Sequence, residues 1–248
     1  MRKITIILSI ICLCFLLYTV VNCAPKGHAI ENLEPGASHQ ARSLPFKEGE
    51  SFTYEVRYSG LKIGKSILTF NGEKELNGRK VYHITFFTKI PSLKDTEEIY
   101  ADKDTFLPIE VHRKIKKKIG FSDNVVEKYD QVNFKVDIKQ KSKLRSRNFS
   151  IQKDSPVHNA ILLAYFYRVK KAFNENERTK IALPTVDFDV MFSGIEAIKT
   201  PMGEYRAYVF TSEPPRFRLW LSADEKRIPL KIKNPGTLGY SLVIRSID

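Results

Sequence analysis

Hydrophobic and polar residues alternate along most of the chain after residue 45. The alternation has a period of two in residues 52–58 (FTYEVRY) and 216–232 (RFRLWLSADEKRIPLKI), and residues 240–246 (YSLVIRS) are interpreted as the last strand. A period of two places successive side chains on opposite faces of a β-strand. The pattern therefore predicts a mainly β domain, built as a large curved antiparallel sheet or an unclosed β-barrel.

Turn sequences separate the predicted strands. Asn71-Gly72 and Asn77-Gly78 are dipeptides typical of tight turns, and the second is flanked by two alternating arms. Residues 200–203 (TPMG) have Pro and Gly in positions that favour a turn between two further strands. In 216–232, the polar residues SADEKR predict a solvent-facing hairpin tip between two arms that share one apolar face.

One strand has apolar side chains on both faces. In residues 81–87 (VYHITFF), Val81 and Phe87 alternate with Tyr82, Ile84 and Phe86. This pattern is typical of a central strand that is covered on two sides. His83 belongs to the pattern, and we interpret it as a packed residue.

One long apolar helix is predicted at about residues 155–173. Ser155 is a good N-cap residue, and Pro156 suits the first helical position. Apolar residues then occupy nearly every face, which requires a helix surrounded by protein. The helix is expected either within the concavity of the sheet or on one of its faces.

The first residues are typical of an export signal or a membrane anchor. Arg2 and Lys3 precede an uncharged, largely apolar run, residues 4–21. Residues 20–23 (VVNC) resemble a bacterial lipobox, which makes Cys23 a candidate for lipidation; an uncleaved anchor and ordinary signal cleavage are the alternatives. We predict a signal peptide or anchor at 1–22, a flexible tether at 23–45 and a single β-rich envelope domain at 46–248.

Positive charge is concentrated in the middle of the chain. The formal net charge is +13, and residues 113–147 contain twelve Lys or Arg against four acidic residues. If 135–147 is extended, its basic residues form one stripe: Lys135, Lys139, Lys141, Lys143, Arg145 and Arg147.

A basic stripe can serve several partners. The export signal and the lack of a nucleic-acid-binding signature argue against nucleic acid. The remaining interpretations are an anionic lipid or glycan of the envelope, or a solvated strand edge that lysines protect from pairing.

Catalytic and metal-binding motifs are missing from the sequence. It has no zinc-protease, nucleophile-elbow, phosphate-loop or dinucleotide motif, and its five histidines are scattered. All three cysteines lie in the first 23 residues, which leaves no disulfide or thiolate metal site in the domain. Asp187 and Asp189 form one carboxylate pair worth testing, whereas Asp224 and Glu225 fit a solvated turn. We expect no cofactor and no metal.

A family resemblance follows from five stretches of the chain. They are FTYEVRYSGLKIGKSILTF, IYADKDTFLPIEV, SPVHNAILLAYFYR, EAIKTPMGEYRAYVF and RLWLSADEKRIPLKI. Together they resemble the bacterial envelope family catalogued as domain of unknown function 3108, from about Phe46 to the C-terminus. The resemblance implies an exported, β-rich domain and supplies no active site. In architecture alone, the predicted domain is similar to the unclosed barrels of lipoprotein carriers such as the Lol proteins.

Three functions fit these patterns. The leading hypothesis is a non-catalytic, periplasm-facing lipoprotein, held at the membrane by its N-terminus, that binds a hydrophobic or anionic ligand such as lipid. The alternatives are a scaffold for an envelope protein or glycan and, with less support, a hydrolase of envelope polymers. The residues expected to line the ligand cavity are Phe86, Leu162, Phe166, Leu219, Leu221 and Leu230.

Overall fold

The fold is described from a computed structural model, which covers residues 44–175, 177–234 and 240–248. Residues 45–248 form one compact unit. Cys23 and the predicted signal and tether lie outside the described residues, apart from Leu44 and Pro45. No helix in the described part of the chain is both long enough and apolar enough to cross a membrane.

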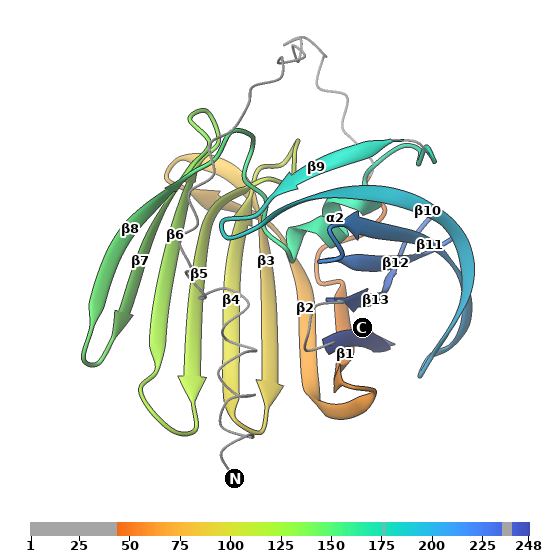
Figure 1. The fold of residues 1–248 in the computed structure, drawn as a ribbon, viewed down its shortest axis with the longest axis horizontal. Helices are drawn as coiled ribbons and strands as arrows, with labels where there is room; N and C mark the ends of the chain where they lie inside the picture. Colours follow the sequence, from red (N-terminus) through yellow and green to blue (C-terminus); the bar gives the residue numbers. More distant parts are fainter. Residues whose placement is uncertain (1–43, 176, 235–239) are drawn as a thin grey trace. The chain divides into compact units, whose positions relative to one another are not determined.

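The described strands form one antiparallel sheet, in which neighbours along the chain are mostly neighbours in space (Figure 1). The spatial order is β8-β7-β6-β5-β4-β3-β2-β1-β14-β13-β12-β11-β10-β9. The strands of the first half are β1 Ser51–Tyr58, β2 Leu61–Leu76, β3 Arg79–Ile90, β4 Leu93–Ala101, β5 Pro108–Lys117, β6 Asp123–Asp130, β7 Lys135–Ser142 and β8 Ser146–Gln152. Those of the second half are β9 Arg178–Ala182, β10 Asp187–Thr200, β11 Gly203–Glu213, β12 Arg218–Ser222, β13 Pro229–Lys233 and β14 Tyr240–Ile247.

The sheet curves around a helix but does not close. Strands β8 and β9 are its two edges, and they are not paired with each other. Instead, the chain after β8 reaches β9 through a parallel bridge between Val157 and Ala182, and the His158 N–H donates to the Ala182 carbonyl at 2.7 Å. The prediction of a mainly β, unclosed antiparallel sheet is confirmed.

The long apolar helix predicted at about 155–173 is wrong in its length. The helix α2 spans only Leu162–Arg168, seven residues. Ser155 is not its cap; the Asn159 side chain accepts from the N–H groups of Ile161 and Leu162 at 2.8 and 3.3 Å. The reason is competition for the backbone, because the Val157–His158 segment is extended and pairs with β9.

The short helix is surrounded, as the apolar pattern indicates. Six of its seven residues are buried, and Phe166 is partly buried. Tyr165 packs against Phe46, Phe70 and Phe106, with ring centroids 5.1, 5.9 and 6.2 Å away. The helix therefore lies within the concavity of the sheet, and we call the sheet face that packs towards it the inner face.

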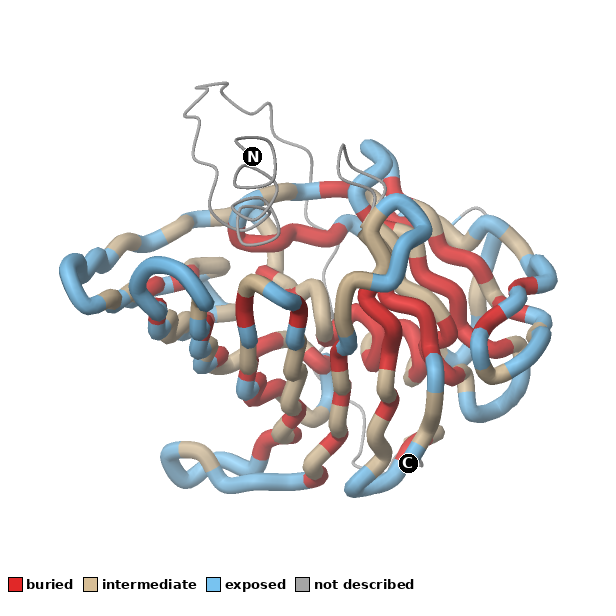
Figure 2. The backbone as a smooth tube through the Cα atoms, turned by 90° about the horizontal axis from the view of Figure 1, so that it is seen from below, coloured by how far each residue is buried: buried red, intermediate tan, exposed pale blue. Residues whose placement is uncertain are grey.

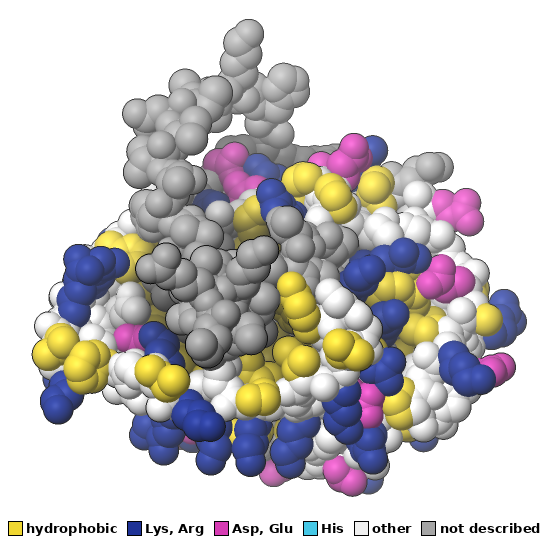
Figure 3. Space-filling model, turned by 60° about the horizontal axis from the view of Figure 1, so that its bottom comes forward, with side chains coloured by type: hydrophobic (Ala, Val, Ile, Leu, Met, Phe, Trp, Pro, Cys, Tyr) yellow, Lys and Arg dark blue, Asp and Glu magenta, His cyan; other side chains and the backbone are white. Residues whose placement is uncertain are grey.

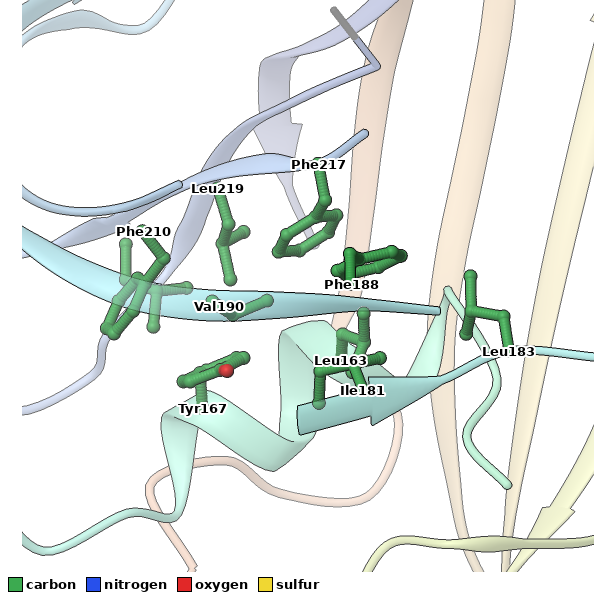
Figure 4. Close-up of a cluster of buried hydrophobic side chains, with 10 residues drawn as sticks. Leu163, Tyr167, Ile181, Leu183, Phe188, Val190, Phe210, Phe217 and Leu219 are labelled. Carbon is green, nitrogen blue, oxygen red and sulfur yellow. The ribbon is translucent and has the colours of Figure 1, made fainter. Parts of the chain in front are cut away.

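The other side of α2 packs on the second half of the sheet (Figure 4). Leu163 and Tyr167 point from the helix towards β9, β10 and β11, and the Tyr167 ring lies 4.5 Å from that of Phe210. The cluster comprises Leu163, Tyr167, Ile181, Leu183, Phe188, Val190, Phe210, Phe217, Leu219 and Leu221. Along the strands, Figure 2 shows buried positions alternating with more exposed ones.

A buried arginine ends the helix. The Arg168 side chain is fully buried, and its guanidinium contacts both Glu50 carboxylate oxygens, at 2.6 and 3.0 Å. It also donates to the carbonyls of Lys226 and Pro45, and it lies 4.6 Å from the centre of the Phe46 ring. One charge thus joins the start of β1, the helix and the turn between β12 and β13.

The predicted hairpin in 216–232 is present as β12 and β13, but its tip is not simply a solvated turn. The side chains of residues 224–226 are exposed. However, Arg227 donates to the carbonyls of Arg168, the last residue of α2, and of Lys170 and Lys171 just beyond it. Asp224 fixes the turn by accepting from the N–H groups of Lys226 and Arg227. The tip therefore caps the helix.

The two Asn-Gly dipeptides behave differently. Asn77 and Gly78 form the β2–β3 turn with φ values of 51° and 78°, as predicted. Asn71 and Gly72 do not form a turn between strands. They lie inside β2, at a register shift between Phe70 and Glu73, where the positive φ of Gly72 makes a bulge.

Replacing Arg168 by alanine is expected to lower the free energy of unfolding by about 3 to 5 kcal/mol, because Glu50 would keep a nearly buried charge without its partner. Equilibrium unfolding in urea measures this loss. The control is Arg178→Ala, since Arg178 pairs with Glu213 at an exposed site; its expected cost is below about 1 kcal/mol. Equal losses in the two variants would contradict the role of Arg168.

Candidate ligand-binding site

The outer face of the first half of the sheet carries a row of lysines. Paired residues of neighbouring strands share a face, and Lys65, Lys89, Lys94 and Lys116 are direct partners across β2, β3, β4 and β5. Lys114 lies on the same face of β5, and the register of β5, β6 and β7 adds two more. We call this outer surface the lysine face: Lys65, Lys89, Lys94, Lys114, Lys116, Lys139 and Lys141.

The charges of these lysines are not neutralised by ion pairs. Within the described residues, none of the seven forms an ion pair. All seven are exposed. Like charges directly opposite each other destabilise a sheet. The row therefore weakens the fold unless an anion neutralises it.

Glu55, in the neighbouring strand β1, is a charge that this protein neutralises with ion pairs. Its carboxylate accepts from Arg57 at 2.7 Å, Lys62 at 3.1 Å and Arg245 at 2.9 Å. Hydrogen bonds, first from Arg57 and then from Lys62 and Arg245, lower the pKa of Glu55 to about 2. This carboxylate pairs with three other cations and not with Lys65, which lies opposite it in the β1–β2 ladder.

The lysine face is hollowed over β3 to β6. The hollow has a volume of about 450 Å³, within the usual range for small-molecule sites. The lining side chains of this face combine partly buried apolar residues with cations and a few polar groups. They are Phe87, Lys94, Thr96, Glu98, His112, Lys114, Lys116, Asn124 and Val126.

Aromatic side chains extend this surface on one side. The rings of His83 and Tyr100 stack with centroids 5.0 Å apart, and Tyr100 meets His112 edge to face at 5.7 Å. The His112 Nε2 lies 2.5 Å from a carboxylate oxygen of Glu110. His83 is thus a packed residue, whereas His112 is exposed and lines the hollow.

The inner face carries a different polar cluster. Arg113 Nε donates to both carboxylate oxygens of Asp95 at 3.0 Å and lies 3.3 Å from Glu97. Asp95 is therefore the main hydrogen-bond acceptor for Arg113. Burial raises the pKa of Glu97 to about 7, against the opposing effect of Arg113. Burial also raises the pKa of Glu127.

The family described as "Protein of unknown function (DUF3108)" matches residues 53–243. The chain belongs to the DUF3108 family. This confirms the resemblance drawn from the five sequence stretches. No curated protein matches the chain.

Three solved structures are similar to this DUF3108 chain. The first is a β-barrel-like DUF1849 protein from Brucella abortus, with 10% identity and a TM-score of 0.48 over 81% of this chain and 97% of that one. The second, provisionally described as an exported protein with a YmcC-like fold, is from Bacteroides fragilis: 11% identity, a TM-score of 0.27, and 83% and 98% covered. The third, provisionally described as a lipoprotein, is from Parabacteroides distasonis: 10% identity, a TM-score of 0.30, and 84% and 100% covered.

The predicted basic stripe is divided in the DUF3108 domain, because residues 135–152 fold into a hairpin. Lys135, Lys139 and Lys141 share the outer face of β7. Lys143 and Arg145 lie in the β7–β8 turn. Arg147 pairs with Gln140, which faces the inner side. The six residues therefore do not form one row.

The six predicted cavity residues occupy other positions. Leu162, Leu219, Leu221 and Leu230 are at most 1% exposed, whereas Phe86 and Phe166 are partly buried. Leu219 and Leu221 belong to the packed cluster in Figure 4, and Phe166 packs against it. None of the six lines the hollow on the lysine face. Their role in ligand binding stays a prediction.

The remaining candidates stand apart from the hollow. Asp187 pairs with Lys153 at 2.8 Å, and Asp189 lies on the same face of β10. Within the described ranges, no group of three or more His, Cys, Asp or Glu side chains could hold a metal ion.

Sequence reasoning missed the lysine row because its members are far apart along the chain. One signal was available: Lys89 and Lys94 flank Pro91-Ser92 symmetrically, so a two-residue turn there places them opposite each other. The partners in β2 and β5 require the register of the sheet, which depends on the bulge in β2.

The raised pKa of Glu97 predicts a pH-dependent stability. Between its ordinary value of 4.5 and about 7, the folded protein binds a proton that the unfolded chain has lost. The contribution of Glu97 to the free energy of unfolding therefore falls as the pH rises through this window.

Glu97→Gln should remove this fall, because glutamine resembles the neutral acid. We expect the variant to exceed the wild type by up to about 3 kcal/mol at pH 8, with little difference at pH 4. Urea unfolding at the two pH values measures it. The neighbouring Glu98→Gln, on the exposed face, is the control. A Glu97→Gln gain that is equal at both pH values would refute the shift.

Proposed function

We propose that this DUF3108 domain is a non-catalytic binding protein of the cell envelope, and that its ligand is an anionic amphiphile such as a lipid. The observation that carries the proposal is the hollow on the lysine face. It places Lys94, Lys114 and Lys116 around the partly buried Phe87 and Val126. Cations beside an apolar floor suit a ligand with an anionic head and a hydrocarbon part.

The energetics of the lysine face support the same ligand class. The lysine partners repel each other across the strands, and an anionic headgroup would replace this repulsion by attraction. The ammonium groups are exposed, so they keep much of their hydration and bind through charge more than through fixed geometry. The site is therefore suited to a class of anionic headgroups.

The sequence adds the cellular context. The N-terminal apolar run and Cys23 favour a domain that is exported and held at a membrane by a lipid, facing the periplasm. A lipoprotein in this place meets anionic amphiphiles at the surface to which it is attached. The proposed function therefore combines membrane anchoring with binding of a lipid headgroup and part of its chain.

Reversing Lys94, Lys114 and Lys116 to glutamate together is expected to weaken binding of short-chain phosphatidylglycerol at least about tenfold, since each cation near an anionic group contributes on the order of 1 kcal/mol. Titration calorimetry on the full chain in neutral detergent measures the affinity.

The control reverses Lys80, Lys171 and Lys226, three exposed lysines outside the hollow, and so changes the net charge equally. Its binding should remain near the wild-type value. Phe87→Ala should weaken binding of the short-chain lipid while leaving glycerol phosphate binding unchanged. Equal losses in the two triple variants, or none in either, would reject the hollow as the site.

A further inference from the structure

Four hairpin turns lie at one end of the sheet. Because β1 to β8 are consecutive antiparallel neighbours, the β1–β2, β3–β4, β5–β6 and β7–β8 turns all lie at the same end, the lower end in Figure 1. We call the residues there the tip surface: 57–65, 89–94, 116–123 and 141–147. The β6–β7 turn lies at the opposite end.

The tips expose large hydrophobic side chains. Leu61, Ile119 and Leu144 are 73%, 86% and 75% exposed, and Phe121 is 44% exposed. Of the large exposed hydrophobic residues among those described, only Val132 and Ile195 lie elsewhere. Nothing in the folding of the domain requires these apolar groups at three separate turns, so their gathering at one end points to a partner.

The same tips are strongly basic. The tip surface contains twelve Lys or Arg and a single acidic residue, Asp123. Asp123 is buried and pairs with Lys117 at 2.7 Å, so it offers little negative charge outward. With the lower end turned towards the viewer, Figure 3 shows Lys and Arg side chains in a band along one border, beside apolar side chains.

The tips are tight and mutually supported. Ser59 and Gly60 both have positive φ, 47° and 83°, as a two-residue hairpin turn requires. The Lys143 ammonium lies 5.9 Å from the centre of the Phe121 ring, which joins the β7–β8 tip to the β5–β6 tip. The apolar side chains are therefore presented on a formed surface, with little ordering left for binding.

We propose that the tip surface docks on an anionic lipid bilayer, with Leu61, Ile119, Phe121 and Leu144 in the interface and the surrounding lysines and arginines on the headgroups. A bilayer fits better than a protein because the apolar groups are single residues on separate turns, and the charged residues around them are almost all positive. That arrangement matches an apolar layer beneath a layer of anionic headgroups.

The docking does not depend on ligand binding in the hollow. The two surfaces share Lys94 and Lys116, but none of the four apolar tip residues lines the hollow. Docking through the tips would set the hollow beside the headgroup layer. A test must therefore use tip residues that lie outside the hollow.

The test measures which surface of the full-length protein enters the bilayer when the protein is anchored to vesicles. Tryptophan is placed at Ile119 or Leu144 and, as a control, at the equally exposed Val132 of the opposite end. The native Trp220 is buried, and its signal is subtracted using the wild type. Brominated phosphatidylcholine mixed with phosphatidylglycerol should quench the two tip reporters at least about twofold more than the Val132→Trp reporter.

Two comparisons complete the test. Lys118→Glu with Lys143→Glu and Arg145→Glu, all outside the hollow, should abolish the extra quenching, and so should vesicles without phosphatidylglycerol. Binding of short-chain phosphatidylglycerol by this variant should match the wild type, which separates docking from the proposed function. Tip quenching no stronger than at Val132→Trp overturns the proposal, and so does tip quenching that is independent of the anionic lipid.

Discussion

The fold depends on one buried charge. Arg168 is fully buried, and a guanidinium can be buried only where its hydrogen bonds are satisfied and an acid balances it. Glu50, the Lys226 carbonyl and the Phe46 ring supply these contacts from regions far apart in the sequence. The chain entering β1, the end of α2 and the β12–β13 turn must therefore assemble together.

This assembly decides which surfaces remain open for binding. The aromatic rings around Tyr165 and the cluster around Tyr167 fill the space on both sides of α2. The helix is thus part of a packed core. Open, charged surface is left on the outer side of β3 to β6 and at the lower turns, where hydrogen-bonded strands hold side chains in fixed rows.

The sequence predicted the class of fold well, but it did not reveal the lysine face. Local patterns were sufficient for the strands, the Asn77-Gly78 turn and the burial of α2. The helix was predicted too long because Val157 pairs with β9, a contact that no local pattern contains. The prediction of one basic stripe was wrong for a related reason. Charges that are close along the chain need not be neighbours on the sheet, because the surface of a sheet is formed by side chains from several strands. Lys65 and Lys116 share a row only through the register of four strands.

The lysine row also couples occupancy to folding. Four ammonium groups side by side raise the free energy of the native sheet, and unfolding separates them. Any anion that settles among them favours the folded chain over the unfolded one, by thermodynamic linkage. Salt screens the same repulsion. An anion that bound among these lysines would therefore raise the melting temperature of the domain.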